Sequence, residues 1–164
     1  MVCGIPVQSL HTKPEATRAE SRMPRYTWNT AWETGIEPID RQHRDMLELL
    51  DSLAEVMKDP DRQSDQEDLL IRLRDCSFQH FAFEEQLMEQ HGFPGLAHHK
   101  RIHDDTRRHL NFLASMYPSY KQMVPAGVLA YLLNWLLEHI SEEDFTFAGY
   151  VRGSAETLRK SERI

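Results

Sequence analysis

The sequence lacks most of the features that mark membrane, secreted and nucleic-acid-binding proteins. It has no run of about 20 apolar residues that could span a membrane, and the apolar stretch at residues 5–7 is too short for a signal peptide. It has only two cysteines, Cys3 and Cys76, so we expect no disulfide framework and a reducing compartment. Acidic residues outnumber basic ones by 26 to 19, for a net charge of −7, which argues against general nucleic-acid binding. We therefore expect a cytoplasmic protein with no nucleic-acid or membrane partner.

Signals for β-strands are also lacking, since there is no sustained alternation of apolar and polar residues and no Asn-Gly or Asp-Gly hairpin turn. From residue 36 onward, apolar residues recur at intervals of three and four, which predicts amphipathic helices. Breaks in this pattern fall at residues 59–61, at residues 92–95, and between Pro118 and Pro125. Four helices joined by short links predict an all-α fold, an up-down-up-down four-helix bundle.

The length of 164 residues suits one folded domain. Residues 1–25 contain three prolines and few large apolar residues, so we expect a flexible N-terminal tail there, with a targeting or docking role as the alternative. The bundle domain is predicted to occupy residues 26–152, and a C-terminal tail residues 153–164. Met23 is a second possible start, which would leave the bundle intact.

Histidine is the residue that the chain has in excess, with nine in all. Five of them interrupt the apolar, core-facing stripes of the helices: His43, His80, His99, His103 and His139. One such histidine is usually a hydrogen-bonded core residue, but five buried imidazoles without partners would cost about 1–3 kcal/mol each. His80 lies four residues before Glu84, and His99 four before His103, so each pair projects from one helix face. A shared metal site inside the bundle would satisfy all of these groups at once.

A second acidic residue, Asp144, follows His139 at a spacing that a regular helix does not favour. The two residues are five apart, which an unbroken helix would separate by about 140°. A Ser-Glu-Glu stretch at residues 141–143 lies between them, and serine is a typical capping residue. We therefore predict that the backbone departs from regular helix there and brings Asp144 towards His139.

The predicted ligand set is five neutral imidazoles and two carboxylates. It contains no thiolate, which disfavours a zinc finger or an iron–sulfur cluster, and its mixture of nitrogen and oxygen suits iron or manganese. Seven ligands are too many for one ion but suit two, and Glu84 and Asp144 can each bridge the ions because a carboxylate has two oxygens. A ferritin-like site would need Glu-x-x-His pairs, and no Glu in this chain lies three residues before a His.

Four motifs contain these residues. They read Trp28…Thr34-Gly35-Ile36…Ile39-Asp40-x-Gln42-His43, then His80-Phe81-x-x-Glu84-Glu85-x-Leu87-Met88, then Gly92-Phe93-Pro94 with His99-Lys100-x-x-His103, and Trp135-Leu136-x-x-His139-Ile140-x-x-x-Asp144. Together they resemble the hemerythrin family, in particular the bacterial hemerythrins, over roughly residues 26–150. One departure is Phe93, which stands where the family commonly has Tyr. The match is specific because seven ligands in four separate motifs must coincide.

The resemblance implies a non-haem di-iron centre inside the bundle. Three histidines would hold one iron: His99, His103 and His139. Two would hold the other iron and leave one position open for O₂: His43 and His80. Glu84 and Asp144 would bridge the two ions together with an oxo or hydroxo group. By position, Met46, Phe81, Trp135 and Leu137 are candidates to line an O₂ pocket, although core packing explains each equally well; we carry Phe81, Trp135 and Leu137 forward.

The resemblance also implies a function, namely reversible O₂ binding for storage, transport or sensing, without enzymatic activity. The alternative is a di-iron enzyme that uses the same site, such as an oxidase, a peroxidase or a nitric-oxide-handling protein. The sequence favours the carrier, because no further carboxylate, tyrosine or histidine is obviously placed as an acid or base beside the pocket. The expected ligand is O₂, with an oxygenase or a signalling protein as a candidate partner.

Overall fold

The computed structural model describes residues 27–120 and 124–161, and most of them are helical. The longer helices are α1 (Glu37–Val56), α2 (Gln63–Gln90), α3 (Leu96–Tyr120), α4 (Ala126–His139) and α5 (Phe145–Ser161). Two short 3-10 helices, η1 (Thr30–Trp32) and η2 (Pro60–Arg62), precede α1 and α2, and a π-helical segment, η3 (Ile140–Asp144), joins α4 to α5. The described residues contain no strand, which confirms the predicted all-α class.

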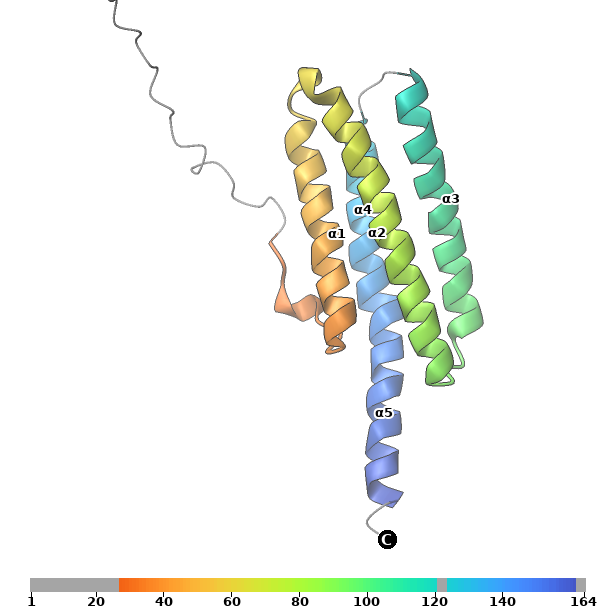
Figure 1. Ribbon diagram of the computed structural model, residues 1–164. Helices are drawn as coiled ribbons and strands as arrows, with labels where there is room; N and C mark the ends of the chain where they lie inside the picture. The colour runs from red at the N-terminus through yellow and green to blue at the C-terminus, as the bar shows by residue number, and fades with distance from the viewer. Residues whose placement is uncertain (1–26, 121–123, 162–164) are drawn as a thin grey trace, which may run out of the picture.

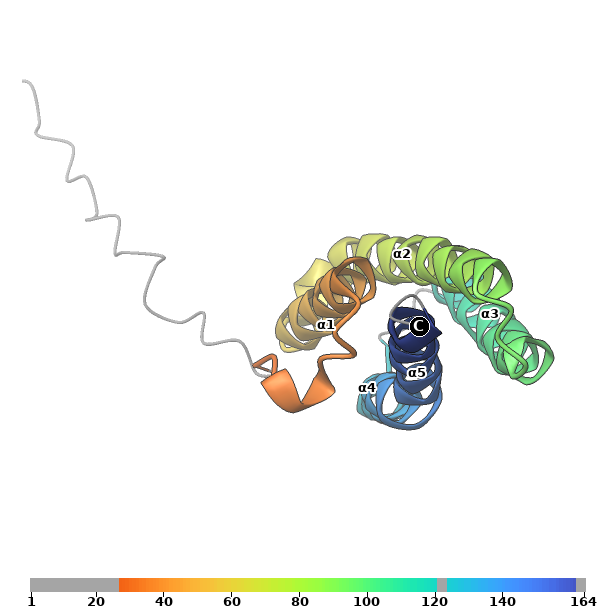
Figure 2. The same cartoon turned by 90° about the horizontal axis from the view of Figure 1, so that it is seen from below.

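Helices α1 to α4 run side by side and alternate in direction (Figure 1). Seen from below, α1, α2 and α3 form an arc, and α4 with α5 faces the inside of that arc (Figure 2). Helix α5 continues the course of α4 beyond the ends of the other helices. This arrangement confirms the up-down-up-down four-helix bundle.

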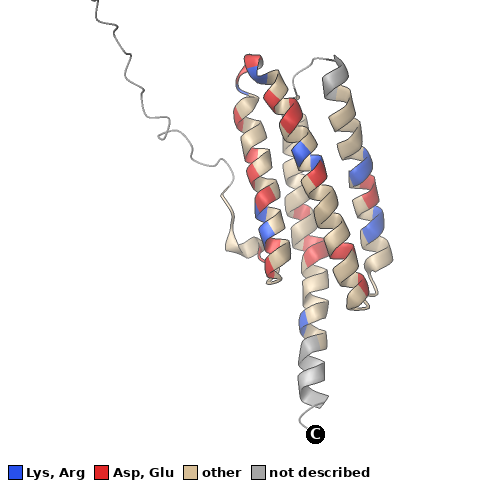
Figure 3. Cartoon of the chain, in the orientation of Figure 1, with Lys and Arg blue, Asp and Glu red and all other residues tan. Residues whose placement is uncertain are grey.

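Charge is distributed unevenly over these helices (Figure 3). Lysine, arginine, aspartate and glutamate side chains are frequent on α1, α2 and α3, whereas α4 carries only Glu138 from these four residue types. The interior holds a large apolar cluster that includes Leu50 of α1 and Leu132 of α4, and a smaller one formed by Ile39, Met88 and Phe147. Fully burying such a side chain contributes about 1.5–3 kcal/mol, so these clusters supply the packing energy of the bundle.

The turn between α2 and α3 shows how the sequence ends a helix. Gly92 adopts a left-handed conformation, with a φ of 63°. This conformation lets the Phe93 amide donate to the Met88 carbonyl at 2.9 Å and the Gly92 amide to the Glu89 carbonyl at 3.1 Å, the Schellman pattern. The chain therefore turns sharply, and α3 returns antiparallel along α2.

The structure corrects one predicted boundary. We expected the link before the fourth helix to begin at Pro118, but α3 continues through this residue to Tyr120. A proline in the last turn removes only one amide donor, the one that would bond to the carbonyl of Ala114, so the helix can continue for two more residues. The prediction was wrong because it treated a proline near a helix end as an immediate stop.

The two ends of the predicted domain have different outcomes. Most of the segment that we expected to be a C-terminal tail, residues 153–164, is helical, because α5 extends to Ser161. The predicted N-terminal tail, residues 1–25, lies outside the described residues, so the domain boundaries stay predictions. Within the described ranges, no helix is both long enough and apolar enough to cross a membrane.

Candidate metal centre

Seven polar side chains converge inside the bundle, and each of them is at most 4% exposed. Every long helix of the bundle contributes: His43 from α1, His80 and Glu84 from α2, His99 and His103 from α3, His139 from the end of α4 and Asp144 from the end of η3. Their nitrogen and oxygen atoms form two groups, and within each group the atoms lie within 4.8 Å of one another. Because Glu84 belongs to both groups, the structure brings all seven predicted ligands to one place.

Three histidines and Glu84 make up the first group. The Nε2 atoms of His103 and His139 lie 3.1 Å apart. The Oε2 atom of Glu84 lies 3.4 Å from Nε2 of His99 and 3.4 Å from Nε2 of His103. The imidazoles therefore present their Nε2 atoms to a common point, with a carboxylate oxygen at its edge.

The second group consists of His43, His80, Glu84 and Asp144. The Nε2 atoms of His43 and His80 lie 3.2 Å apart, and Oε2 of Glu84 lies 3.3 Å from Nε2 of His80. Asp144 places Oδ2 3.2 Å from Nε2 of His43 and Oδ1 3.2 Å from Nε2 of His139 in the first group. Both carboxylates therefore face both groups, as residues that bridge two ions must.

The π-helical segment η3 is what brings Asp144 into the centre. In a π-helix, hydrogen bonds join residues five apart rather than four, so positions with this spacing come together on one face. Asp144 follows His139 by five residues, and the Phe145 amide that closes the segment bonds to the carbonyl of Ile140. The predicted departure from regular helix at residues 141–143 is confirmed.

The hydrogen bonding of this centre is incomplete without a metal. Eight buried side-chain nitrogen and oxygen atoms in the described part of the chain have no hydrogen-bond partner. All eight belong to five of the predicted ligands: His43, Glu84, His99, His139 and Asp144. Folded proteins contain few such atoms, since each costs about 1–3 kcal/mol. Imidazole nitrogens and carboxylate oxygens suit iron and manganese, so the residues present fit a site for two metal ions.

Comparison with known proteins agrees with this geometry. The family model for the hemerythrin HHE cation-binding domain matches residues 34–151, which is more than half of the chain. The chain belongs to the hemerythrin family. This confirms the resemblance seen in the four motifs, and the family is one whose model describes cation binding.

Individual relatives of this hemerythrin-family chain are similar over most of their length. A bacteriohemerythrin of Stenotrophomonas maltophilia is 31% identical over 131 residues, which cover 76% of this chain and 80% of the relative. A hemerythrin of Themiste dyscrita is 30% identical over 126 residues, which cover 77% and 94%. A crystal structure of wild-type hemerythrin matches with a TM-score of 0.72 at 24% identity and covers 76% of this chain and 96% of that one, which shows the same fold.

Burial and close contact determine the charge of the residues in this hemerythrin-type centre. Burial lowers the pKa of four imidazoles: His80, His99, His103 and His139, the last to about 4. Burial and the neighbouring Asp144 raise the pKa of Glu84 well above its usual value. Burial also acts to raise the pKa of Asp144, but His139 and His43 outweigh it and lower that pKa to about 2. A neutral imidazole keeps a free lone pair on one ring nitrogen, and this neutral form is the one that binds metals.

Two residues of this centre have contacts that the sequence did not predict. Nδ1–H of His80 donates to Oε1 of Gln42 at 3.0 Å, and Nδ1–H of His103 donates to Oε1 of Glu85 at 2.9 Å. Such bonds hold the ring with Nε2 free to face a metal. Gln42 and Glu85 each stand next to a predicted ligand in the motifs, and this adjacency was the available signal.

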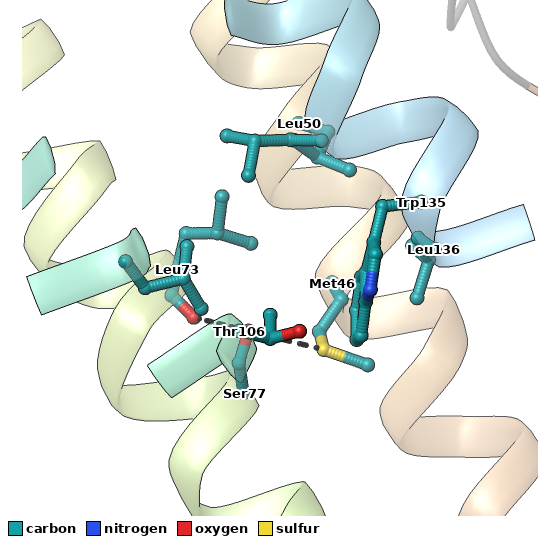
Figure 4. Close-up of a pocket in the computed structure, with 9 residues that line it drawn as sticks. Met46, Leu50, Leu73, Ser77, Thr106, Trp135 and Leu136 are labelled. Carbon is teal, nitrogen blue, oxygen red and sulfur yellow. Dashed lines mark hydrogen bonds between the residues drawn. The ribbon is translucent and has the colours of Figure 1, made fainter. Parts of the chain in front are cut away.

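A small cavity of about 20 Å³ lies inside the bundle (Figure 4). Met46, Ser77 and Thr106 line it, and each lies three residues from a predicted ligand on its own helix. Trp135 also lines it and stacks on His139, with the ring centroids 4.8 Å apart.

The three residues predicted to line an O₂ pocket are placed differently. Trp135 is a cavity residue. Phe81 is fully buried and stacks on His103 at 4.1 Å between ring centroids, while Leu137 packs against the large apolar cluster. Neither Phe81 nor Leu137 lines the cavity, and contact of all three with O₂ stays a prediction.

Proposed function

We propose that this chain is a di-iron protein that binds O₂ reversibly, for oxygen storage, transport or sensing. The observation that carries the proposal is the convergence of five imidazoles and two carboxylates in a buried centre, with a small cavity in the same bundle. The names of the relatives support it, since they include bacteriohemerythrin, hemerythrin and myohemerythrin.

The residues divide into two binding positions. One iron would be held by three histidines: His99, His103 and His139. The other would be held by two, which leaves room for a further ligand: His43 and His80. Glu84 and Asp144 would bridge the ions together with an oxo or hydroxo group, and the distances from these carboxylates to both groups support that role.

Bound ferrous iron would supply the electrons that O₂ accepts when it binds. The protein supplies the surroundings. The cavity of about 20 Å³ exceeds the roughly 10–15 Å³ that one water-sized molecule requires, so it can hold a molecule as small as O₂. Its walls are mainly apolar, with Met46, Leu50 and Trp135 among them, and such walls favour O₂ over water.

The hydroxyl groups at this cavity support a carrier rather than an enzyme. Ser77 donates to the carbonyl of Leu73 at 2.8 Å, and Thr106 donates to the carbonyl of Ile102 at 3.0 Å. The Oγ of Ser77 also lies 3.4 Å from Sδ of Met46, a second acceptor, so both hydroxyl protons are engaged by acceptors within the protein. An oxidase or peroxidase must deliver protons to reduced oxygen, and these two hydroxyls are not arranged to do so.

Reduction of the iron-loaded protein without air, followed by exposure to O₂, tests the proposal. A carrier develops a visible charge-transfer band that bleaches when O₂ is removed and returns over repeated cycles. Immediate oxidation with release of hydrogen peroxide would overturn the proposal and indicate an oxidase instead. The iron content, measured before reduction, must be two ions per chain.

A further inference from the structure

His103 is held on its outer side by a clamp of three residues from two helices. Its Nδ1–H donates to Oε1 of Glu85 at 2.9 Å, and Nη2 of Arg107 donates to the same oxygen at 2.8 Å. The Phe81 ring stacks on the imidazole at 4.1 Å between centroids and 19° between planes, and the Arg107 guanidinium carbon lies 5.3 Å from the centroid of the Phe81 ring. Phe81 and Glu85 are one turn apart on α2, as are His103 and Arg107 on α3, so the two helices interlock around this imidazole.

The other imidazoles of the centre have no comparable partner among the described residues. The Nδ1 atom of His80 faces Gln42, whose amide oxygen carries no net charge. The Nδ1 atoms of His43 and His139 have no hydrogen-bond partner in the described structure. The Nδ1 atom of His99 lies 4.0 Å from a carboxylate oxygen of Glu143, which is too far for a hydrogen bond.

A carboxylate behind an imidazole changes what the imidazole offers to a metal. By accepting Nδ1–H, Glu85 fixes the tautomer in which Nε2 carries the lone pair, and its negative charge makes that lone pair a stronger donor. The effect is strengthened because Glu85 is only 14% exposed and therefore poorly screened by water. A stronger donor stabilises ferric iron more than ferrous iron. Arg107 opposes this effect, since it withdraws charge from the same oxygen at 2.8 Å; Lys100 opposes it more weakly, since its exposed Nζ lies 3.9 Å from the other oxygen of Glu85.

We propose that Glu85 is a positioning residue that makes His103 a strong donor, and that Arg107 sets the strength of this effect. The inference rests on the proposed function, because it concerns the position that would hold iron through His99, His103 and His139. Iron held at this position is more easily oxidised than iron held by His43 and His80. At that second position, the hydrogen-bond partner of His80 Nδ1 is the neutral Gln42.

Two substitutions that change the charge in opposite ways test the proposal. Glu85→Gln removes the charge but keeps the shape and an oxygen that can accept Nδ1–H. Arg107→Met removes the competing donor but keeps an apolar stem over Phe81. Glu89→Gln is the matched control, since Glu89 is exposed on the same helix and the change in charge is identical.

The first readout is the midpoint potential of the iron-loaded protein, measured by spectroscopic redox titration. We expect Glu85→Gln to retain both irons and to lower the preference for ferric over ferrous iron by about tenfold, a rise of about 59 mV for a one-electron couple. Arg107→Met should shift the potential in the opposite direction, and Glu89→Gln should leave it unchanged. A merely structural role would move the first two variants in the same direction, which would overturn the proposal.

The second readout needs no metal. Nitrogen NMR of the metal-free protein reports which ring nitrogen of His103 carries the proton. The Nδ1–H tautomer should dominate in the wild type and in Glu85→Gln but not in Glu85→Leu, which has no acceptor. An unchanged tautomer in Glu85→Leu would overturn the positioning role even if the protein failed to bind iron. If the wild type binds O₂ but Glu85→Gln and Glu89→Gln share its potential, this inference fails and the proposed function stands.

Discussion

Removal of the metal should destabilise this protein strongly, because the residues of the centre do not satisfy one another. Eight buried nitrogen and oxygen atoms have no hydrogen-bond partner within the described structure. At about 1–3 kcal/mol each, they would cost about 8–24 kcal/mol if they all stayed dry. That penalty matches or exceeds the whole free energy of unfolding of a typical domain, about 5–15 kcal/mol.

The metal-free protein must therefore relax, by admitting water to the centre, and it retains only part of this penalty. We expect the free energy of unfolding to fall by at least about 3 kcal/mol when iron is removed, the lower end of the cost of leaving a buried charge without its partner. For a chain of this size, such a loss lowers the Tm by about 6–12 °C.

The assay is guanidinium unfolding followed by far-ultraviolet circular dichroism, on protein with two irons and on the same protein after reduction and chelation. Restoring the iron should restore the stability. Hydrogen exchange should locate the loss: amides around Glu84 and His103 should exchange faster without iron, and those around Leu50 and Leu132 should change little. Equal unfolding free energies with and without iron would refute the reasoning that the metal satisfies the buried atoms.

Three substitutions test other parts of the structure. His103→Ala should lower the iron content below two ions per chain by elemental analysis, and full loading would contradict the proposed role of this ligand. Leu132→Phe should fill the cavity and lower O₂ affinity by about tenfold, because the side chains around the cavity must then rearrange at a cost of about 1.4 kcal/mol in binding free energy. The variant should keep its iron. The same change at Leu133, which is buried but does not line the cavity, should leave O₂ binding unaltered. Gln66→Leu should lower the free energy of unfolding, measured in denaturant, by about 1–3 kcal/mol, because the buried glutamine accepts a hydrogen bond from a backbone amide in the segment before α4. Gln86→Leu, at an exposed position, is the control.

The helices and the predicted ligands could be read from the sequence because both depend on local spacing. Residues three or four apart share a face of any α-helix, so the apolar stripes and the pairs His80–Glu84 and His99–His103 follow from the helical repeat alone. The distortion before Asp144 could be predicted for the same reason, since a spacing of five conflicts with a regular helix. Pro118 was misjudged because a proline weakens the last turn of a helix without necessarily ending it.

The contacts around the predicted ligands could not be read in this way. Glu85 meets His103 only because α2 and α3 pack with a particular register, and nothing in the local sequence states which residue of one helix faces which residue of the other. The cavity is also a property of packing. It combines side chains of four helices, and Trp135 lines it while Phe81, just as plausible by position, stacks on a ligand instead.

The sequence by itself determined the helical class, the number of helices in the bundle and the seven polar residues that point into it. These features follow from periodicities within single helices, which do not depend on neighbouring segments. Only the tertiary structure decided that the seven side chains form two overlapping groups and that two carboxylates face both groups. It also decided that His103 alone, among the five imidazoles of the described centre, has a carboxylate within hydrogen-bond distance of its Nδ1 atom. Distances between helices result from the packing of all their side chains together, so they appear only when the bundle is assembled.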